Sequence, residues 1–331
     1  MLKIGVIGTG HLGKIHAKLW KEVGGTELIG VFDANAEEAK RVAAEHGVQV
    51  FSSAEKLIDS VDAVSIVTPT FAHFEVAKRA IGRSKHVLIE KPITTTITEA
   101  QELIALAKKQ NVKIQVGHIE RFNPALLAVE AFIDKPMFFE SDRLAQFKPR
   151  GTDVAVVLDL MIHDIDVILS LVRSEVTSVD ASGVAVVSDE IDIASARIKF
   201  ANGAIANVTA SRISQNPMRK LRIFEKDAYL SVDFASKSAE VFHLVGAKEA
   251  GESRSLVFNL GEIERADKKL NIVYEKPEVK DFNPLKYELE LFRDAIINNT
   301  VPVVSGEDGL AALDVAEKIM ASIRENGIRQ N

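Results

Sequence analysis

Short apolar runs alternate with amphipathic stretches over the first 118 residues of the chain. The runs that predict strands are Lys3–Gly8, Leu28–Asp33, Ala63–Thr68, His86–Glu90 and Lys113–His118. The stretches between them predict helices over Leu12–Val23, Ala36–His46, Ala72–Arg83 and Glu99–Gln110, with Gly47 and Asn111 at the positions of C-terminal caps. Because strands that are apolar nearly throughout are typical of a sheet covered on both faces, this part predicts a parallel α/β sheet.

The pattern changes near residue 120. A helix is predicted over Pro124–Ile133, a strand over Met137–Gln146, a long helix over Val154–Val172, and two last helices over Pro284–Asn298 and Gly306–Glu325. Ile191–Phe200 and Ala204–Arg212 flank Asn202-Gly203 and predict a hairpin, whose alternating first strand is typical of an open antiparallel sheet. We therefore expect one domain over residues 1–120 and a second, α+β domain over residues 121–331, whose C-terminal helix can pack back on the first.

Composition narrows the class of protein. The chain has 331 residues, 47% apolar and 27% charged, which is ordinary for a globular protein of two domains. It has no cysteine, so disulfides, thiolate metal sites and a cysteine nucleophile are excluded. A net charge of −6 with mixed signs argues against nucleic acid as a partner. No membrane-spanning stretch or targeting leader is recognisable, and we expect a cytoplasmic location.

A glycine-rich turn joins the first predicted strand to the first helix. Gly8-Thr9-Gly10-His11-Leu12-Gly13 reads G-x-G-x-x-G, and Asp33 ends the second strand 20 residues beyond Gly13. Such glycines let a pyrophosphate approach a helix N-terminus, and the acid accepts hydrogen bonds from the adenosine ribose. Asp33 would repel a 2′-phosphate, so the turn indicates NAD rather than NADP, although Arg41 in the next helix could favour NADP.

Two further segments carry candidate chemistry. Lys91, in Glu90-Lys91-Pro92, follows the fifth strand and so lies at the sheet edge where ligands bind, unless the segment is an ordinary surface turn. The helix near residue 160 is apolar nearly all round except for a strip of Asp159, His163 and Asp166. Buried ionisable groups need partners or a ligand. A structural histidine and a metal site formed by the three polar residues are the alternatives to a catalytic pair.

The chain resembles the glucose–fructose oxidoreductase/inositol dehydrogenase (Gfo/Idh/MocA) family along nearly its whole length. The resemblance rests on the glycine motif followed by His16, on Thr68-Pro69 with His73, on Glu90-Lys91-Pro92, on Asp159-x-x-x-His163, and on the stretch from Gly309. It implies a Rossmann domain followed by an open-sheet domain that binds substrate and forms homodimers or homotetramers. It also implies that Lys91, Asp159 and His163 line the substrate site, and that Thr68, Pro69, His73 and Glu90 join the glycine turn in the cofactor site.

Two short segments, Thr152–Leu158 and Gly117–Pro124, make the chain most similar to the UDP-N-acetylglucosamine 3-dehydrogenase branch of that family. The expected reaction is oxidation of a secondary hydroxyl of a sugar or nucleotide sugar by NAD, with Lys91 and His163 handling the proton and Asp159 orienting one of them. A free polyol or monosaccharide dehydrogenase and a non-catalytic NAD-binding regulator are the alternatives. Five arginines are candidate partners of a diphosphate: Arg121, Arg143, Arg150, Arg212 and Arg219.

Overall fold

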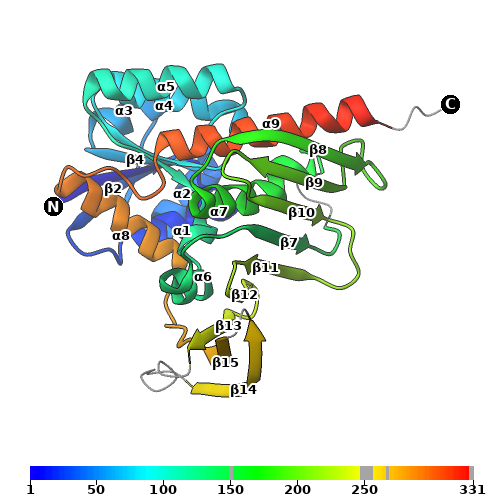
Figure 1. The fold of residues 1–331 in the computed structure, drawn as a ribbon. Helices are drawn as coiled ribbons and strands as arrows, with labels where there is room; N and C mark the ends of the chain where they lie inside the picture. Colours follow the sequence, from blue (N-terminus) through cyan, green and yellow to red (C-terminus); the bar gives the residue numbers. More distant parts are fainter. Residues whose placement is uncertain (149–151, 247–255, 266–267, 328–331) are drawn as a thin grey trace. The chain divides into compact units, whose positions relative to one another are not determined.

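A computed structural model describes the chain apart from residues 149–151, 247–255, 266–267 and 328–331 (Figure 1). The chain forms two compact units. The first contains Met1–Ile119 and Asn283–Asp314, and the second contains Glu120–Phe282 and Val315–Asn331. Within the described residues, no helix combines the length and the apolar character needed to cross a membrane.

The first unit is built on a parallel sheet with the strand order β3-β2-β1-β4-β5-β6. Its strands are β1 (Leu2–Ile7), β2 (Thr26–Phe32), β3 (Gln49–Val50), β4 (Ala63–Ile66), β5 (His86–Glu90) and β6 (Ile114–Gly117). Its helices are α1 (His11–Trp20), α2 (Ala36–His46), α3 (Ala54–Asp59), the turn η1 (Thr70–Ala72), α4 (His73–Gly82), α5 (Ile97–Gln110) and α8 (Pro284–Ile297), with the first residues of α9 (Gly306–Asn326). The helices α1, α2 and α8 cover one face, and α3, α4 and α5 cover the other (Figure 1). The predicted doubly covered parallel sheet is therefore confirmed.

Local signals account for most of these boundaries. The predicted C-terminal caps are confirmed: Gly47 and Asn111 both adopt the left-handed conformation that ends α2 and α5. The helix α5 begins with a capping box, in which Thr96 and Glu99 each accept a backbone N–H of the other. The strand β3 and the helix α3 were not predicted, because two and six residues are too short for periodicity to show.

The late helix α8 packs on the first unit rather than on the second. Phe292 of α8 lies edge to face against Trp20 of α1, with ring centroids 6.5 Å apart. Trp20 is fully buried and donates its indole N–H to the hydroxyl of Ser65 on β4 at 2.7 Å. A single apolar cluster thus joins residues from both ends of the chain.

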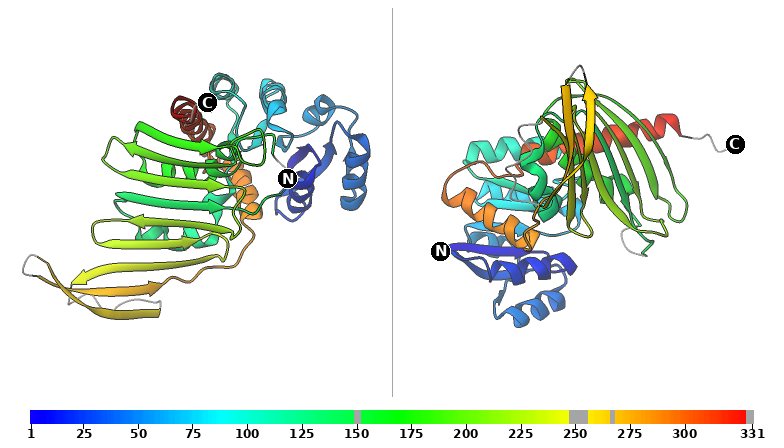
Figure 2. Two further views of the ribbon diagram at one scale, coloured as in Figure 1. Left: turned by 90° about the vertical axis from the view of Figure 1, so that its right-hand side faces the viewer. Right: turned by 60° about the horizontal axis from the view of Figure 1, so that its bottom comes forward.

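The second unit holds a nine-stranded sheet with the order β14-β15-β13-β12-β11-β7-β10-β9-β8 (Figure 2). Its strands are β7 (Phe138–Leu144), β8 (Val176–Val184), β9 (Ile193–Phe200), β10 (Ile205–Ser211), β11 (Met218–Phe224), β12 (Ala228–Asp233), β13 (Ser238–Gly246), β14 (Leu256–Arg265) and β15 (Lys268–Lys276). Its helical elements are η2 (Ile119–Phe122), α6 (Pro124–Val129), η3 (Glu130–Phe132), η4 (Val157–Met161), α7 (Ile162–Val172) and the end of α9. All neighbouring strands are antiparallel except β7 and β10, so the predicted mainly antiparallel sheet is confirmed.

The prediction of a helix over Val154–Val172 is wrong for the first turn and correct for its end. The helical segment starts at Val157 with the π-helical turn η4 and continues as α7. The residues before it are held elsewhere, because the Val154 carbonyl accepts the Arg212 guanidinium and the Val156 N–H donates to the Ile191 carbonyl. The Val154 carbonyl, which an earlier turn would need as an acceptor, is thus bound to Arg212, and the Val156 N–H ties the backbone before η4 to Ile191.

Candidate active site

The glycine turn connects β1 to α1 in a conformation that needs its glycines. Gly8 has φ +94°, and a Cβ there would lie 2.5 Å from the carbonyl oxygen of Val67. A Cβ on Gly13 would lie 1.9 Å from the carbonyl oxygen of Gly8. At Gly10, by contrast, a Cβ would meet no heavy atom within 4 Å, so the backbone before the first turn of α1 faces open space. A phosphate-bearing group fits this turn, since it can approach the backbone closely.

Asp33 at the end of β2 braces the same turn. Its Oδ2 accepts the backbone N–H of Thr9 at 2.6 Å and the Thr9 hydroxyl at 3.1 Å, while Oδ1 accepts the N–H of Asn35 at 2.8 Å. A carboxylate has about four acceptor positions, so Asp33 can also accept ribose hydroxyls. The Arg41 guanidinium is paired with Glu38, which also binds Lys14. The cation that could favour NADP is therefore already engaged by an acid.

His73, the first residue of α4, ties two loops together. Its Nε2 lies 2.9 Å from the Thr68 carbonyl oxygen after β4, and its Nδ1 lies 2.9 Å from the Pro92 carbonyl oxygen after β5. The side chain is buried, and burial lowers the pKa of His73 although the carbonyls of Pro92 and Thr68 act in the opposite direction. His73 thus shapes the loops of the proposed cofactor site, whereas Pro69 beside it is exposed.

Glu90 and Lys91 lie at the carboxyl end of β5, where open α/β sheets bind ligands. Both side chains are half-buried, and the Lys91–Pro92 peptide bond is cis. Glu90 Oε1 lies 3.0 Å from Nε2 of the fully buried His16 on α1. In this unit the glycine turn, Asp33, Thr68 and Lys91 therefore all follow the carboxyl ends of four strands: β1, β2, β4 and β5.

In the second unit, Asp159 belongs to η4 and His163 to the first turn of α7. Both are half-buried, whereas Asp164 and Asp166 of the same helix are buried. Helical spacing of about four residues places Asp159 and His163 on one face. Of the three residues in the predicted polar strip, these two keep the exposure that a reacting group needs.

The two buried aspartates of α7 each bind an arginine in bidentate geometry. Arg121 of η2 donates to both oxygens of Asp166 at 2.8 and 2.7 Å. Arg143 of β7 donates to both oxygens of Asp164 at 2.6 and 3.0 Å, and to Glu120 at 2.9 Å. Burial alone lowers the pKa of Arg143, but the carboxylates of Asp164 and Glu120 raise it by more than burial lowers it. The guanidinium therefore stays charged.

These pairs change the interpretation of the candidate arginines. Arg121 and Arg143 are engaged by carboxylates rather than presented to a ligand. Arg212 is buried and contacts the Val154 carbonyl, Arg150 lies outside the described residues, and Arg219 is 52% exposed. Asp166 is likewise bound to Arg121, and among the described residues no three acids or histidines are grouped as metal ligands. Sequence spacing could not have revealed these partners, since 45 residues separate Arg121 from Asp166.

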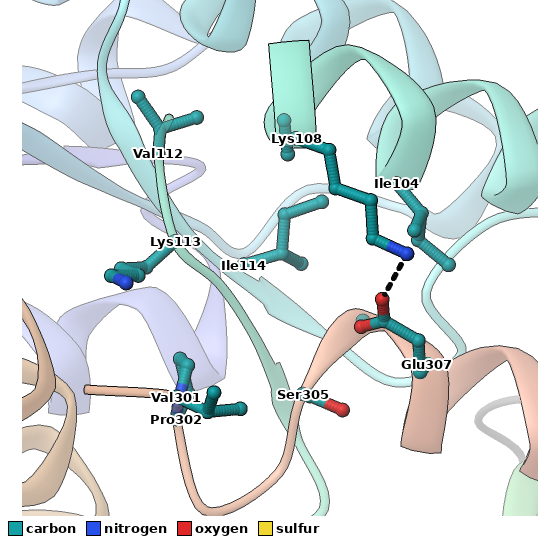
Figure 3. A pocket seen from close by; sticks show the side chains of 11 residues that line it. Ile104, Lys108, Val112, Lys113, Ile114, Val301, Pro302, Ser305 and Glu307 are labelled. Atoms are coloured by element: carbon teal, nitrogen blue, oxygen red, sulfur yellow. Dashed lines mark ion pairs between the residues drawn. The ribbon is translucent and has the colours of Figure 1, made fainter. Parts of the chain in front are cut away.

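A separate pocket of about 150 Å³ lies in the first unit between α5, β6 and the start of α9 (Figure 3). Its walls are largely aliphatic, and the charged pair at its rim, Lys108 and Glu307, is joined by an ion pair of 2.8 Å. None of the candidate site residues lines it. The pocket is therefore separate from the candidate site residues of the first unit.

Comparison with known proteins agrees with this geometry. Residues 2–118 match the family model described as an oxidoreductase family with an NAD-binding Rossmann fold, and residues 125–231 match the GFO/IDH/MocA C-terminal domain. A UDP-N-acetylglucosamine 3-dehydrogenase from Acidithiobacillus ferrooxidans is 45% identical over 243 residues, covering 73% of this chain and 77% of the relative. A solved structure of an enzyme of that name and organism superposes with a TM-score of 0.87 at 38% identity, covering 98% of each chain. A scyllo-inositol 2-dehydrogenase (NAD(+)) from Bacillus subtilis is 33% identical over 64% of this chain and 68% of the relative.

Proposed function

The chain belongs to the Gfo/Idh/MocA family of NAD-dependent oxidoreductases, and on that premise we propose that it oxidises the 3-hydroxyl of UDP-N-acetylglucosamine to a ketone. The observation that carries the substrate is the similarity to the Acidithiobacillus enzyme, at 45% identity over most of the chain. The second candidate is a free inositol, which the similarity to the Bacillus inositol dehydrogenase favours.

The proposed mechanism assigns the proton to side chains of this chain. When bound, NAD supplies the hydride acceptor, and the glycine turn and Asp33 hold its pyrophosphate and ribose. Lys91 and His163 share the removal of the hydroxyl proton, because hydride loss from an alcohol leaves a ketone only if that proton also leaves. Asp159 shares a helical face with His163 and orients the hydroxyl or the base.

The test is a substrate panel followed by absorbance of the reduced nicotinamide. The purified protein is supplied with NAD and, in turn, UDP-N-acetylglucosamine, other UDP-sugars, free sugars and inositols. Turnover confined to UDP-N-acetylglucosamine supports the proposal. Turnover of inositol alone favours the second candidate, and binding of NAD without turnover of any compound points to a regulator.

The roles of the proton-handling residues have their own test. Lys91→Met and His163→Ala are each expected to lower kcat by about 10²- to 10⁴-fold, which is the usual contribution of a general acid or base. The dissociation constant of NADH, measured by the fluorescence of the bound reduced nicotinamide, stays within about twofold of the parent value, a change of only about 0.4 kcal/mol. Lys91→Arg is the matched control for charge, because arginine keeps the charge but cannot release a proton at neutral pH. A variant with full turnover would overturn the assignment.

We also propose that the protein is a homo-oligomer, a dimer or tetramer, that acts in the cytoplasm. An aromatic row crosses six neighbouring strands of the second unit, made up of Phe138, Phe224, Tyr229, Phe242, Tyr274 and Phe258, with centroid distances of 4.9 to 6.2 Å. Strand alternation places this row opposite the face on which Arg143 binds α7. A row of this kind is typical of a surface that a protein partner covers.

A further inference from the structure

Two buried histidines hold the residues on either side of Lys91. His16, on α1, contacts the side chain of Glu90, and His73, on α4, contacts the backbone carbonyl of Pro92. The exposed fractions of the two histidine side chains are 0% and 1%, so neither can reach a substrate. Both histidines lie outside β5, the strand that precedes Lys91. His16 is 74 residues from Glu90, and His73 is 19 residues from Pro92.

The Glu90 side chain has little freedom to leave His16. Its Oε1 lies 3.0 Å from the His16 Nε2. On its other side it packs against Gly117 of β6, where a Cβ would come within 2.8 Å of the carboxyl carbon and both oxygens. The carboxylate is therefore confined between a buried imidazole and the backbone of the neighbouring strand, and the end of β5 is held with it.

His73 constrains the other side of Lys91 and extends the constraint to the glycine turn. Its ring spans the carbonyl oxygens of Pro92 and Thr68, each 2.9 Å from a ring nitrogen. The backbone at Thr68 in turn lies under Gly8, because a Cβ on Gly8 would lie 2.8 Å from the Thr68 nitrogen. One side chain thus sets the spacing between the loop of Lys91 and the turn that fits a pyrophosphate.

We propose that His16 and His73 are positioning residues that together fix Lys91 relative to the glycine turn. The inference rests on the proposed function, in which Lys91 handles the proton of the hydroxyl. A proton-transfer group must lie within hydrogen-bond reach of its target, and a displacement of about 1 Å can cost roughly a hundredfold in rate. One contact before Lys91, at Glu90, and one after it, at Pro92, hold the backbone on both sides. A single contact would still let the backbone at Lys91 shift.

The experiment measures the reactivity of the Lys91 amine separately from turnover. Each histidine is replaced in turn by alanine, asparagine and glutamine. Labelling of Lys91 by an amine-acetylating reagent is followed by mass spectrometry as a function of pH, and kcat and KM for NAD are measured on the best compound of the substrate panel. His86 is the matched control, because it is a half-buried histidine on the same strand whose Nδ1 accepts the N–H of Lys113 at the amino end.

The alanine variants of His16 and His73 are expected to change the Lys91 labelling rate several-fold and to lower kcat by about ten- to a hundredfold. In the His16 variants the KM for NAD moves much less than kcat, whereas in the His73 variants both change, because His73 also sets the spacing to the turn that fits a pyrophosphate. In the His16 variants glutamine recovers most of both properties, since its amide reaches the place of Nε2 and can donate to Glu90, whereas the shorter asparagine does not. In the His73 variants asparagine reaches the place of Nδ1 beside Pro92 and glutamine reaches the place of Nε2 beside Thr68, so each recovers only part of the loss. The same series at His86 stays within about twofold, or 0.4 kcal/mol, of the parent. This dependence on side-chain reach is not expected of a merely space-filling residue.

The proposal is overturned if folded variants at His16 and His73 keep the parent labelling profile of Lys91, or if His16→Asn and His16→Gln behave alike. If the alanine variants do not fold, the comparison of His16→Asn with His16→Gln decides the matter. If no compound is turned over by the parent protein, the proposed function fails, while the labelling profiles still decide whether the two histidines position Lys91.

Discussion

Asp33 illustrates how a single side chain can serve the fold and the ligand together. Its carboxylate accepts both donors of Thr9 and the N–H of Asn35, so it holds the glycine turn from the end of β2. The same negative charge disfavours a 2′-phosphate. Asp33 therefore sets the shape of the turn, and we propose that it also sets the selectivity for NAD over NADP.

Replacing Asp33 by serine is expected to lower kcat/KM for NAD by about tenfold or more, because the loss of a hydrogen bond to a charged group costs about 1.5–3 kcal/mol. The kcat/KM for NADP is expected to rise at the same time, since the repulsion between Asp33 and the 2′-phosphate is removed. The two values are measured in parallel, with Glu38→Gln as the control acid on α2. An unchanged ratio of the two cofactors would contradict this assignment of Asp33.

The loop before β9 is organised by the carboxylate of Asp192. Its Oδ2 accepts the N–H groups of Val186, Val187 and Ser188 at 2.8, 2.7 and 3.0 Å, and its Oδ1 accepts the Ser188 hydroxyl at 2.7 Å. Burial alone raises the pKa of Asp192, but the hydrogen bonds from Val187, Ser188 and Val186 outweigh it and hold the pKa well below its ordinary value.

A lowered pKa in the folded state means that the ionised carboxylate stabilises the fold above its unfolded pKa, near 3.9, and that this stabilisation is lost as the pH falls through the folded value. Asp192→Asn is therefore expected to be less stable than the parent at pH 6, and the difference is expected to narrow below about pH 4. Urea unfolding at several pH values measures this difference. A gap that stays constant with pH would show that the charge of Asp192 has no part in it.

Two arginine–aspartate pairs hold the helix α7 in the second unit. Arg143 is the more buried of the two arginines and lies between Asp164 and Glu120. Arg143→Met leaves two carboxylates without their cation, and the free energy of unfolding is expected to fall by about 3–5 kcal/mol. Arg219 faces Arg143 across β7 and β11 but is 52% exposed and lies 3.9 Å from Glu120, so Arg219→Met is expected to cost less than about 1 kcal/mol. Equal losses in urea unfolding would refute the buried network as the anchor of α7.

For the whole molecule, the main prediction concerns the aromatic row on the second unit. Phe224 lies in the row between Phe138 and Tyr229, at centroid distances of 5.9 and 5.0 Å. Phe224→Asp introduces a charge into the proposed interface and is expected to shift the protein to monomers in sedimentation velocity. Ile297→Asp is the control, because Ile297 is an apolar side chain of α8 with 59% exposure. A parent protein that is already monomeric would remove the proposed interface.

The distance along the chain between a residue and its partner explains which parts of the candidate site could be predicted. The glycine turn, Asp33 and the end of β5 follow from strand ends and residue types, and both are local properties of the chain. The partners of His16, Arg121 and Arg143 lie 74, 45 and 21 residues away in the chain, and no periodicity of the sequence relates them. From the sequence, Arg121 and Arg143 are therefore candidate partners of a diphosphate, although in the structure their charges are paired with Asp166 and Asp164.

The sequence by itself determined most elements of the first unit, including both ends of α2, and the hairpin of β9 and β10 in the second. The alternation of strands and helices and the two-residue period of β9 imply a doubly covered parallel sheet and an open antiparallel one. The sequence determined these features because side-chain periodicity and caps act within a few residues. Only the tertiary structure decided that α8 completes the core of the first unit and that His16 and His73 bracket Lys91. Contacts of this kind depend on which surfaces are brought together when the chain buries its apolar area, and that outcome belongs to the fold as a whole.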